Sequence, residues 1–118
     1  MCTTNKRRDR IKQKTTTTQR EMKNMENLFE TKQQLILKLK DAEDRLTNQK
    51  NILKNKENDL WLNTEFKALG YTNDDTRRAY VNHEISDLKL AEELIRNEIT
   101  MLKRELNLCD DKIKLFTI

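Results

Sequence analysis

Apolar residues recur along two stretches of the chain with the spacing of packed helices. Over residues 21–62, a seven-residue repeat counted from Met25 is apolar at eight of its eleven a and d positions. Those positions are Met25, Leu28, Lys32, Leu35, Leu39, Ala42, Leu46, Gln49, Leu53, Lys56 and Leu60. Over residues 74–116 the corresponding set has one polar member, Glu92, among Val81, Ile85, Leu88, Ile95, Ile99, Leu102, Leu106, Cys109, Ile113 and Phe116. This period predicts two long helices with coiled-coil seams.

The segment between these helices carries signals for a turn. The apolar phase slips near Asn63, so we expect the first helix to bend there, or to stop and restart. Thr64 can cap a short turn over residues 65–69, which Gly70, the only glycine, ends in a left-handed conformation. Thr72 or Asn73 then suits the N-cap of the second helix. The acidic residues that follow are stabilised there, because the helix dipole places partial positive charge at the N-terminus. The turn is predicted at about residues 63–73.

Two helices of similar length joined by a tight turn pack against each other in opposite directions. The predicted fold class is therefore all-α, a long antiparallel two-helix hairpin over residues 21–118 that forms a coiled coil. In this register Leu46 should lie opposite Ile99, and Leu28 should lie near Phe116. The absence of proline and the 37% of charged residues agree with long helices that are exposed on most sides.

A third apolar row widens the second helix beyond the needs of a two-helix seam. It consists of Leu94, Met101, Leu108 and Leu115, and Phe29 and Ile36 widen the first helix in the same way. A single hairpin would leave these side chains in water, at a cost of about 1.5–3 kcal/mol each. The pattern therefore predicts a homodimer that forms a helical bundle, or a partner protein on this face.

Charge is concentrated at the start of the chain. Residues 1–20 carry seven basic residues against Asp9, a net charge of +6, whereas the whole chain carries +4 and the remainder is mildly acidic. Thr15 to Thr18 is a run of weak helix formers, so we expect residues 1–20 to be a flexible basic arm or a fraying helix. The arm either binds DNA or RNA electrostatically or serves as a solvated tail. The binding candidates are Lys6, Arg7, Arg8, Arg10, Lys12 and Lys14.

The sequence carries no pattern typical of an enzyme. His83 beside Glu84 makes no dyad on a helix, and no phosphate loop, nucleophile elbow or metal-binding set is present. We expect no catalytic residue, no metal and no cofactor. No apolar run approaches the roughly 20 residues of a membrane span, and no signal-peptide core follows Met1, so a cytoplasmic location is expected.

Aromatic residues gather at the predicted turn. Four of the six in the chain lie between residues 60 and 81, together with two arginines. They form either a small core that holds the turn or an exposed binding surface, since Trp, Tyr and Arg dominate binding hot spots. For Arg77 and Arg78 the alternative is an ion pair with Asp74 or Glu65. The partner-binding candidates are Trp61, Tyr71, Arg77, Arg78 and Tyr80. Phe66, Leu69 and Tyr80 suit a core because their spacing continues helical faces, whereas Tyr71 and Arg78 flank the turn and suit a contact.

The turn resembles the centre of small coiled-coil accessory proteins of phages and archaeal viruses. The resemblance covers roughly residues 40–118 and rests on Thr64-Glu65-Phe66, Leu69-Gly70, Thr72-Asn73-Asp74, Arg77 and Ala79-Tyr80-Val81. It implies a viral protein that binds a host complex for defence or replication in the host cytoplasm, and inhibits or modulates it, as an anti-CRISPR protein or nuclease inhibitor does. Two alternatives remain, a nucleic-acid-binding accessory protein that uses the arm and the turn, and a structural coiled-coil scaffold.

Overall fold

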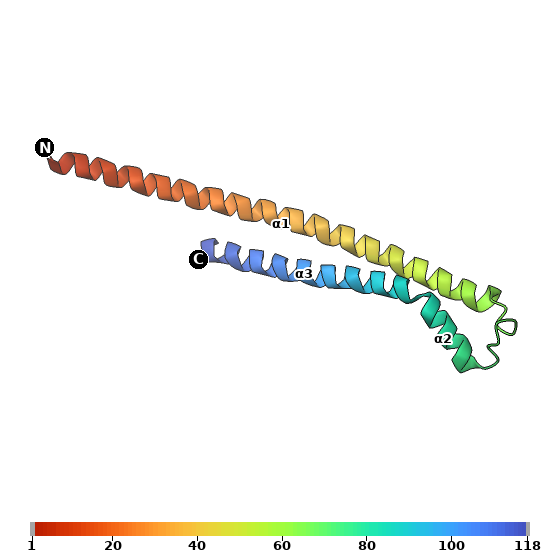
Figure 1. Ribbon diagram of the computed structural model, residues 1–118. Coiled ribbons are helices and arrows are strands. Elements are labelled where there is room, and N and C mark those ends of the chain that lie inside the picture. The colour runs from red at the N-terminus through yellow and green to blue at the C-terminus, as the bar shows by residue number, and fades with distance from the viewer. Residues whose placement is uncertain (1, 118) are drawn as a thin grey trace. The chain divides into compact units, whose positions relative to one another are not determined.

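The chain is all-α, as the sequence pattern predicts. The computed structural model describes the backbone of residues 2–117 and the side chains of residues 19–116. Three helices follow one another, α1 (Cys2–Asn63), α2 (Asp74–Glu84) and α3 (Ser86–Thr117), and the described range contains no strand (Figure 1). The chain divides into two compact units, one of Lys38–Leu102 and the other of Met1–Leu37 with Lys103–Ile118.

Helix α1 begins well before the predicted start at residue 21. It includes the backbone of the predicted arm from Cys2 onward, because this segment has no proline or glycine and is rich in Lys, Arg and Gln. The run of threonines from Thr15 to Thr18 weakens a helix but does not end one. The side chains of the predicted nucleic-acid-binding residues lie outside the described residues, namely Lys6, Arg7, Arg8, Arg10, Lys12 and Lys14.

Burial along α1 follows the predicted heptad positions. From Met25 to Leu60 every a and d position is buried or half-buried except Lys56, whose place is taken by its neighbour Glu57. All other side chains of this stretch are exposed. The seven-residue repeat therefore identifies the packed face of α1.

In the unit of Lys38–Leu102, polar contacts join α1 to α3. Arg45 Nη2 lies 2.9 Å from Glu98 Oε2, and Gln49 Nε2 donates a hydrogen bond to the carbonyl of Leu88 at 3.2 Å. Higher residue numbers on α1 meet lower ones on α3, so the two segments run in opposite directions within this unit. The hydrogen bond from Arg45 to Glu98, and then that to Asp41, raises the pKa of Arg45. The ion pair agrees with the predicted alignment of Leu46 with Ile99.

The unit of Met1–Leu37 and Lys103–Ile118 has an ion pair and a hydrogen bond between α1 and α3. Lys32, one of the polar intrusions in the seam, places Nζ 2.7 Å from Asp110 Oδ1. The thiol of buried Cys109 donates to the carbonyl of Leu28 at 3.2 Å. The Lys32 ammonium therefore has a charged partner at the edge of the seam.

The second predicted helix is not continuous. Residues 74–116 were expected to form one helix, but α2 ends at Glu84 and α3 begins at Ser86. Between them Ile85 is fully buried, with φ −99° and ψ 5°, and Ser86 Oγ donates to the carbonyl of His83 at 2.8 Å. Val81 and Ile85 pack into a cluster at the turn, and the rest of α3 packs along α1. We attribute the break to these two packing demands, which one straight helix does not meet.

The turn between α1 and α2 contains the predicted left-handed glycine and the predicted N-cap of α2. Gly70 has φ +85°, its N–H donates to the carbonyl of Lys67, and the N–H of Tyr71 donates to the carbonyl of Phe66 at 2.9 Å. These are the two hydrogen bonds of a Schellman motif. Asn73 caps α2, because its side chain accepts a hydrogen bond from the N–H of Thr76 at 2.8 Å. At Thr64 the backbone carbonyl, rather than the predicted side-chain cap, bonds the N–H of Phe66.

Replacing Gly70 should test the left-handed terminator. A Cβ at this position meets no atom within 4 Å, so the whole cost of Gly70→Ala is backbone strain at positive φ. We expect a loss of about 1 kcal/mol in the free energy of unfolding. Gly70→Asn is the control, since Asn tolerates this conformation and should lose less. Urea denaturation measures both variants, and equal losses would contradict the assignment.

Candidate functional site

The turn is built around a hydrophobic cluster, which we call the tip cluster. Its buried residues are Leu60 from α1, Phe66 from the turn, Val81 from α2, and Ile85, which directly follows α2. Leu53, Tyr71 and Tyr80 are partly buried against it. The cluster lies wholly within the unit of Lys38–Leu102. It joins α1, the turn and α2, so the turn has a defined shape.

The aromatic rings of the turn pack on one another. Phe66 is the central ring, with its centroid 5.6 Å from that of Trp61 and 6.2 Å from that of Tyr80, edge to face. Tyr71 extends the set, with its ring 5.2 Å from Tyr80. The structure therefore brings together all three aromatic candidates for partner binding, Trp61, Tyr71 and Tyr80.

The two arginine candidates differ in their surroundings. Arg77 is half-buried, its guanidinium carbon lies 5.4 Å from the centre of the Phe66 ring, and its Nε donates to the carbonyl of Tyr71 at 3.2 Å. It is thus held by a ring and a backbone carbonyl, not by the expected carboxylates of Asp74 or Glu65. Arg78 is exposed, and none of the described residues forms an ion pair with it. Arg77 therefore braces the turn, and Arg78 is available to a partner.

Exposure at the turn differs from the sequence expectation at two positions. Leu69, expected in the core, is 53% exposed, whereas Tyr71, expected to make a contact with a partner, is half-buried on the tip cluster. Tyr71 follows the glycine of the Schellman motif, a position whose side chain commonly packs back on the preceding turn. The carbonyl of Phe66 accepts its N–H, which keeps the two residues together.

One exposed apolar residue was missed by the sequence reasoning. Leu62 is 82% exposed, and beside it in sequence Trp61 keeps 38% of its surface exposed although its ring contacts Phe66. The signal was the phase slip near Asn63, which moves Leu62 out of the seam one residue before α1 ends. The large apolar residues exposed at the turn are therefore Trp61, Leu62 and Leu69, and Arg78 in the following helix is exposed as well.

A hollow at the turn lies next to the central ring. It is lined by Thr64, Glu65, Phe66, Lys67, Ala68 and Arg77. The charged side chains around it have both signs, so it offers ion-pair partners to basic and acidic groups alike. Such a mixed lining suits polar contacts at the rim of a protein interface.

No protein-family model, curated protein or solved structure matches the chain. His83 is exposed at the end of α2, and among the described side chains no three potential ligands gather as a metal site would require. Within residues 2–117 no helix has the length and hydropathy of a membrane span. The candidate site is the exposed surface of the turn, which includes Trp61, Leu62, Leu69 and Arg78.

Proposed function

We propose that this chain is a non-catalytic protein-binding module that docks through its turn onto a host complex for defence or nucleic-acid processing. The class of partner follows the resemblance to phage and archaeal virus accessory proteins. One observation carries the docking site, namely that Trp61 stays 38% exposed although its ring packs on Phe66 in a set of four aromatic rings. A Trp packed on an aromatic cluster, with an exposed arginine in the helix that follows the turn, has the composition of a binding hot spot.

The tip cluster supports this role because it fixes the surface before binding. The Schellman hydrogen bonds, the Asn73 cap and the Arg77 contacts hold the turn in one shape. A preformed surface loses less conformational entropy on association than a flexible loop does. We infer that the whole chain forms one antiparallel helical hairpin that carries this surface, which the opposite directions of α1 and α3 within the unit of Lys38–Leu102 support.

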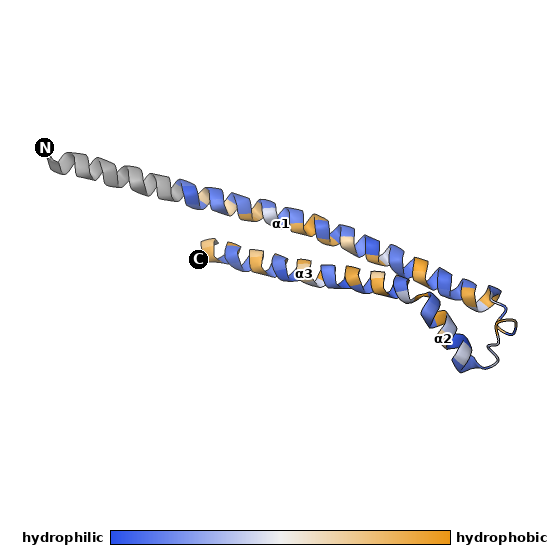
Figure 2. Ribbon diagram, in the orientation of Figure 1, coloured by the Kyte–Doolittle hydropathy of each residue, from blue (hydrophilic) through white to orange (hydrophobic). Residues whose placement is uncertain are grey.

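We also propose that two copies of the chain associate into a homodimer. Leu94, Met101, Leu108 and Leu115 are each 60–76% exposed, and the hydropathy colouring shows apolar residues recurring along α3 (Figure 2). Burying such side chains contributes about 1.5–3 kcal/mol each. Sedimentation of the full chain tests this proposal, and a monomer at every concentration would reject it.

A paired substitution tests the docking surface. Trp61→Ala with Arg78→Glu should lower the recovery of the host complex more than tenfold in quantitative co-purification, because hot-spot residues commonly contribute 2 kcal/mol or more. The thermal midpoint should fall by less than for truncation of the buried Phe66, because Arg78 is exposed and Trp61 keeps 38% of its surface exposed. The matched control combines Ile52→Ala with Lys54→Glu, the same kinds of change at exposed positions of α1. A complex recovered as well with the turn variant as with the control would contradict the proposal.

The second candidate function is nucleic-acid binding by the basic residues 1–20. The side chains of residues 1–18 lie outside the described residues, so nucleic-acid binding remains a prediction from charge alone. Affinity for DNA or RNA that falls steeply with salt would favour it. A chain that neither recovers a host complex nor binds nucleic acid would favour the structural scaffold.

A further inference from the structure

Helix α3 carries two exposed leucines in the unit of Met1–Leu37 and Lys103–Ile118. Leu108 is 60% exposed and Leu115 is 76% exposed, whereas Cys109, next to Leu108, is 5% exposed. The spacing of seven residues places both leucines on one face of α3, outside the seam with α1. This face is apolar and no described residue covers it.

Four charged side chains flank Leu108 without a charged partner. They are Arg104 and Asp111 on one edge of the leucine row and Glu105 and Lys112 on the other, and all are exposed. No ion pair joins any of them to another described residue. The neighbouring Asp110, by contrast, is 2.7 Å from Lys32. Each edge thus carries one positive and one negative charge, two helical turns apart.

These charges complement those of a second copy of the same helix. We propose that α3 pairs with α3 of a second copy in antiparallel orientation, centred on Leu108, and this inference rests on the homodimer proposed above. In antiparallel helices, equivalent edges face each other. Glu105 then lies opposite Lys112 of the second copy, and Arg104 lies opposite Asp111 of the second copy. Each pair is offset by one residue, about 1.5 Å along the axis. The two-fold axis makes each pair occur twice.

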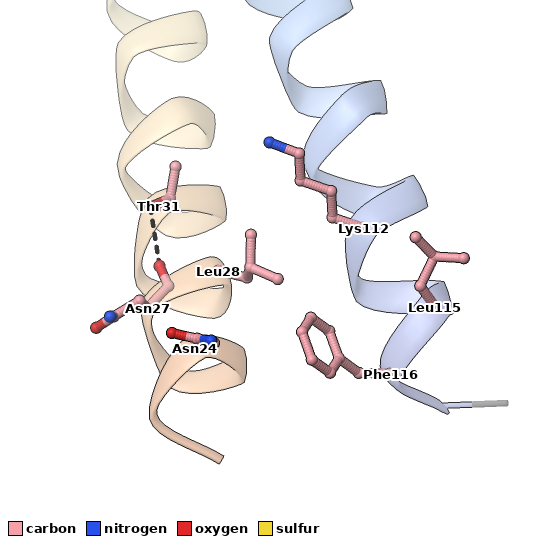
Figure 3. A pocket seen from close by; sticks show the side chains of 7 residues that line it. All are labelled: Asn24, Asn27, Leu28, Thr31, Lys112, Leu115 and Phe116. Carbon is pink, nitrogen blue, oxygen red and sulfur yellow. Dashed lines mark hydrogen bonds between the residues drawn. The ribbon is translucent and has the colours of Figure 1, made fainter. Parts of the chain in front are cut away.

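An apolar groove beside Leu108 favours the antiparallel orientation. Two hollows between α1 and α3 share Leu28, Thr31 and Lys112, and Glu105 and Leu108 also line one of them. Figure 3 shows Leu28 and Phe116 facing each other in this groove, with Lys112 extending toward α1. Arg104 and Asp111 line neither hollow.

The groove therefore lies on the edge of Glu105 and Lys112. Antiparallel pairing brings this edge against the same edge of the second copy, so both grooves are covered together. Parallel pairing sets the edge of Glu105 and Lys112 against the edge of Arg104 and Asp111 in the second copy. The two grooves then stay open on opposite sides of the dimer. The antiparallel dimer thus covers more of the apolar surface that α3 and α1 expose here.

Charge-reversal substitutions in the full chain test whether this face of α3 forms the dimer interface and whether the two helices pair antiparallel. Sedimentation equilibrium under reducing conditions should give a dimer for the unmodified chain. Leu108→Glu should raise its dissociation constant about a hundredfold or more, because it places two carboxylates at the centre of the interface. Glu105→Lys and Lys112→Glu should each raise the constant about tenfold, because each creates two like-charge pairs. The double variant, Glu105→Lys with Lys112→Glu, should restore the original dissociation constant if the helices pair antiparallel. In a parallel dimer the double variant would keep the raised dissociation constant.

The controls separate the possible failures. Lys103→Glu, on the other side of α3, should leave the dissociation constant unchanged, and circular dichroism should show full helicity for every variant. An unmodified chain that stays monomeric would overturn both this surface and the homodimer proposed above. A dimer that tolerates Leu108→Glu would overturn this surface alone. The antiparallel pairing would be overturned if Glu105→Lys and Lys112→Glu each weaken the dimer and their combination does not restore the original dissociation constant.

Discussion

Phe66→Ala should lower the free energy of unfolding by about 3–5 kcal/mol, the cost of removing a buried aromatic ring. Phe66 is 8% exposed, its ring contacts Trp61 and Tyr80, and the guanidinium of Arg77 lies over its face. A domain of this size has roughly 5–15 kcal/mol in total, so the midpoint should fall by roughly 10–20 °C. Thermal unfolding followed by circular dichroism at fixed protein concentration measures the change.

Two further variants show whether the loss comes from the ring at this site. Phe29→Ala makes the same chemical change at a residue of α1 that is 45% exposed, and should cost well under half as much. Phe66→Leu keeps an apolar side chain but removes the ring contacts, and should fall between Phe66→Ala and the unmodified chain. Equal losses for Phe66→Ala and Phe29→Ala would show that the tip cluster is not a stabilising core.

Ile85→Ala should lower the free energy of unfolding by about 2–4 kcal/mol. Ile85 has no exposed surface, and it stands between α2 and α3 while its side chain packs with Leu60, Phe66 and Val81. Truncation leaves a cavity and removes the contact that holds α2 over the cluster. Denaturant unfolding at fixed protein concentration measures the loss.

Ile52→Ala is the matched control for this change. Ile52 is 51% exposed on α1, so the same truncation there should stay within about 0.5 kcal/mol. Comparable losses at the two positions would contradict the assignment of Ile85 as the anchor of the α2–α3 break. A loss at Ile85 that appears only in the amide exchange of α2 would place the anchor in a locally unfolding segment.

Much of the candidate site follows from local sequence, and some of it does not. The position of the turn, the left-handed Gly70 and the Asn73 cap depend on residues close in the chain, so their patterns were sufficient. The role of Arg77 was not predictable in this way. Its partners are a ring centre and a backbone carbonyl at the turn, and neither appears in a search for opposite charges.

The heptad repeat by itself determined that the chain is helical and which face of α1 is packed, because helix periodicity and burial are both set by spacing along one chain. Only the tertiary structure decided that the second helix breaks at Ile85, since nothing in residues 74–116 breaks a helix locally. It also decided that Tyr71 is half-buried and Leu69 exposed. These outcomes depend on how α2 and the turn close over Phe66, a contact between segments whose mutual geometry the local pattern does not encode.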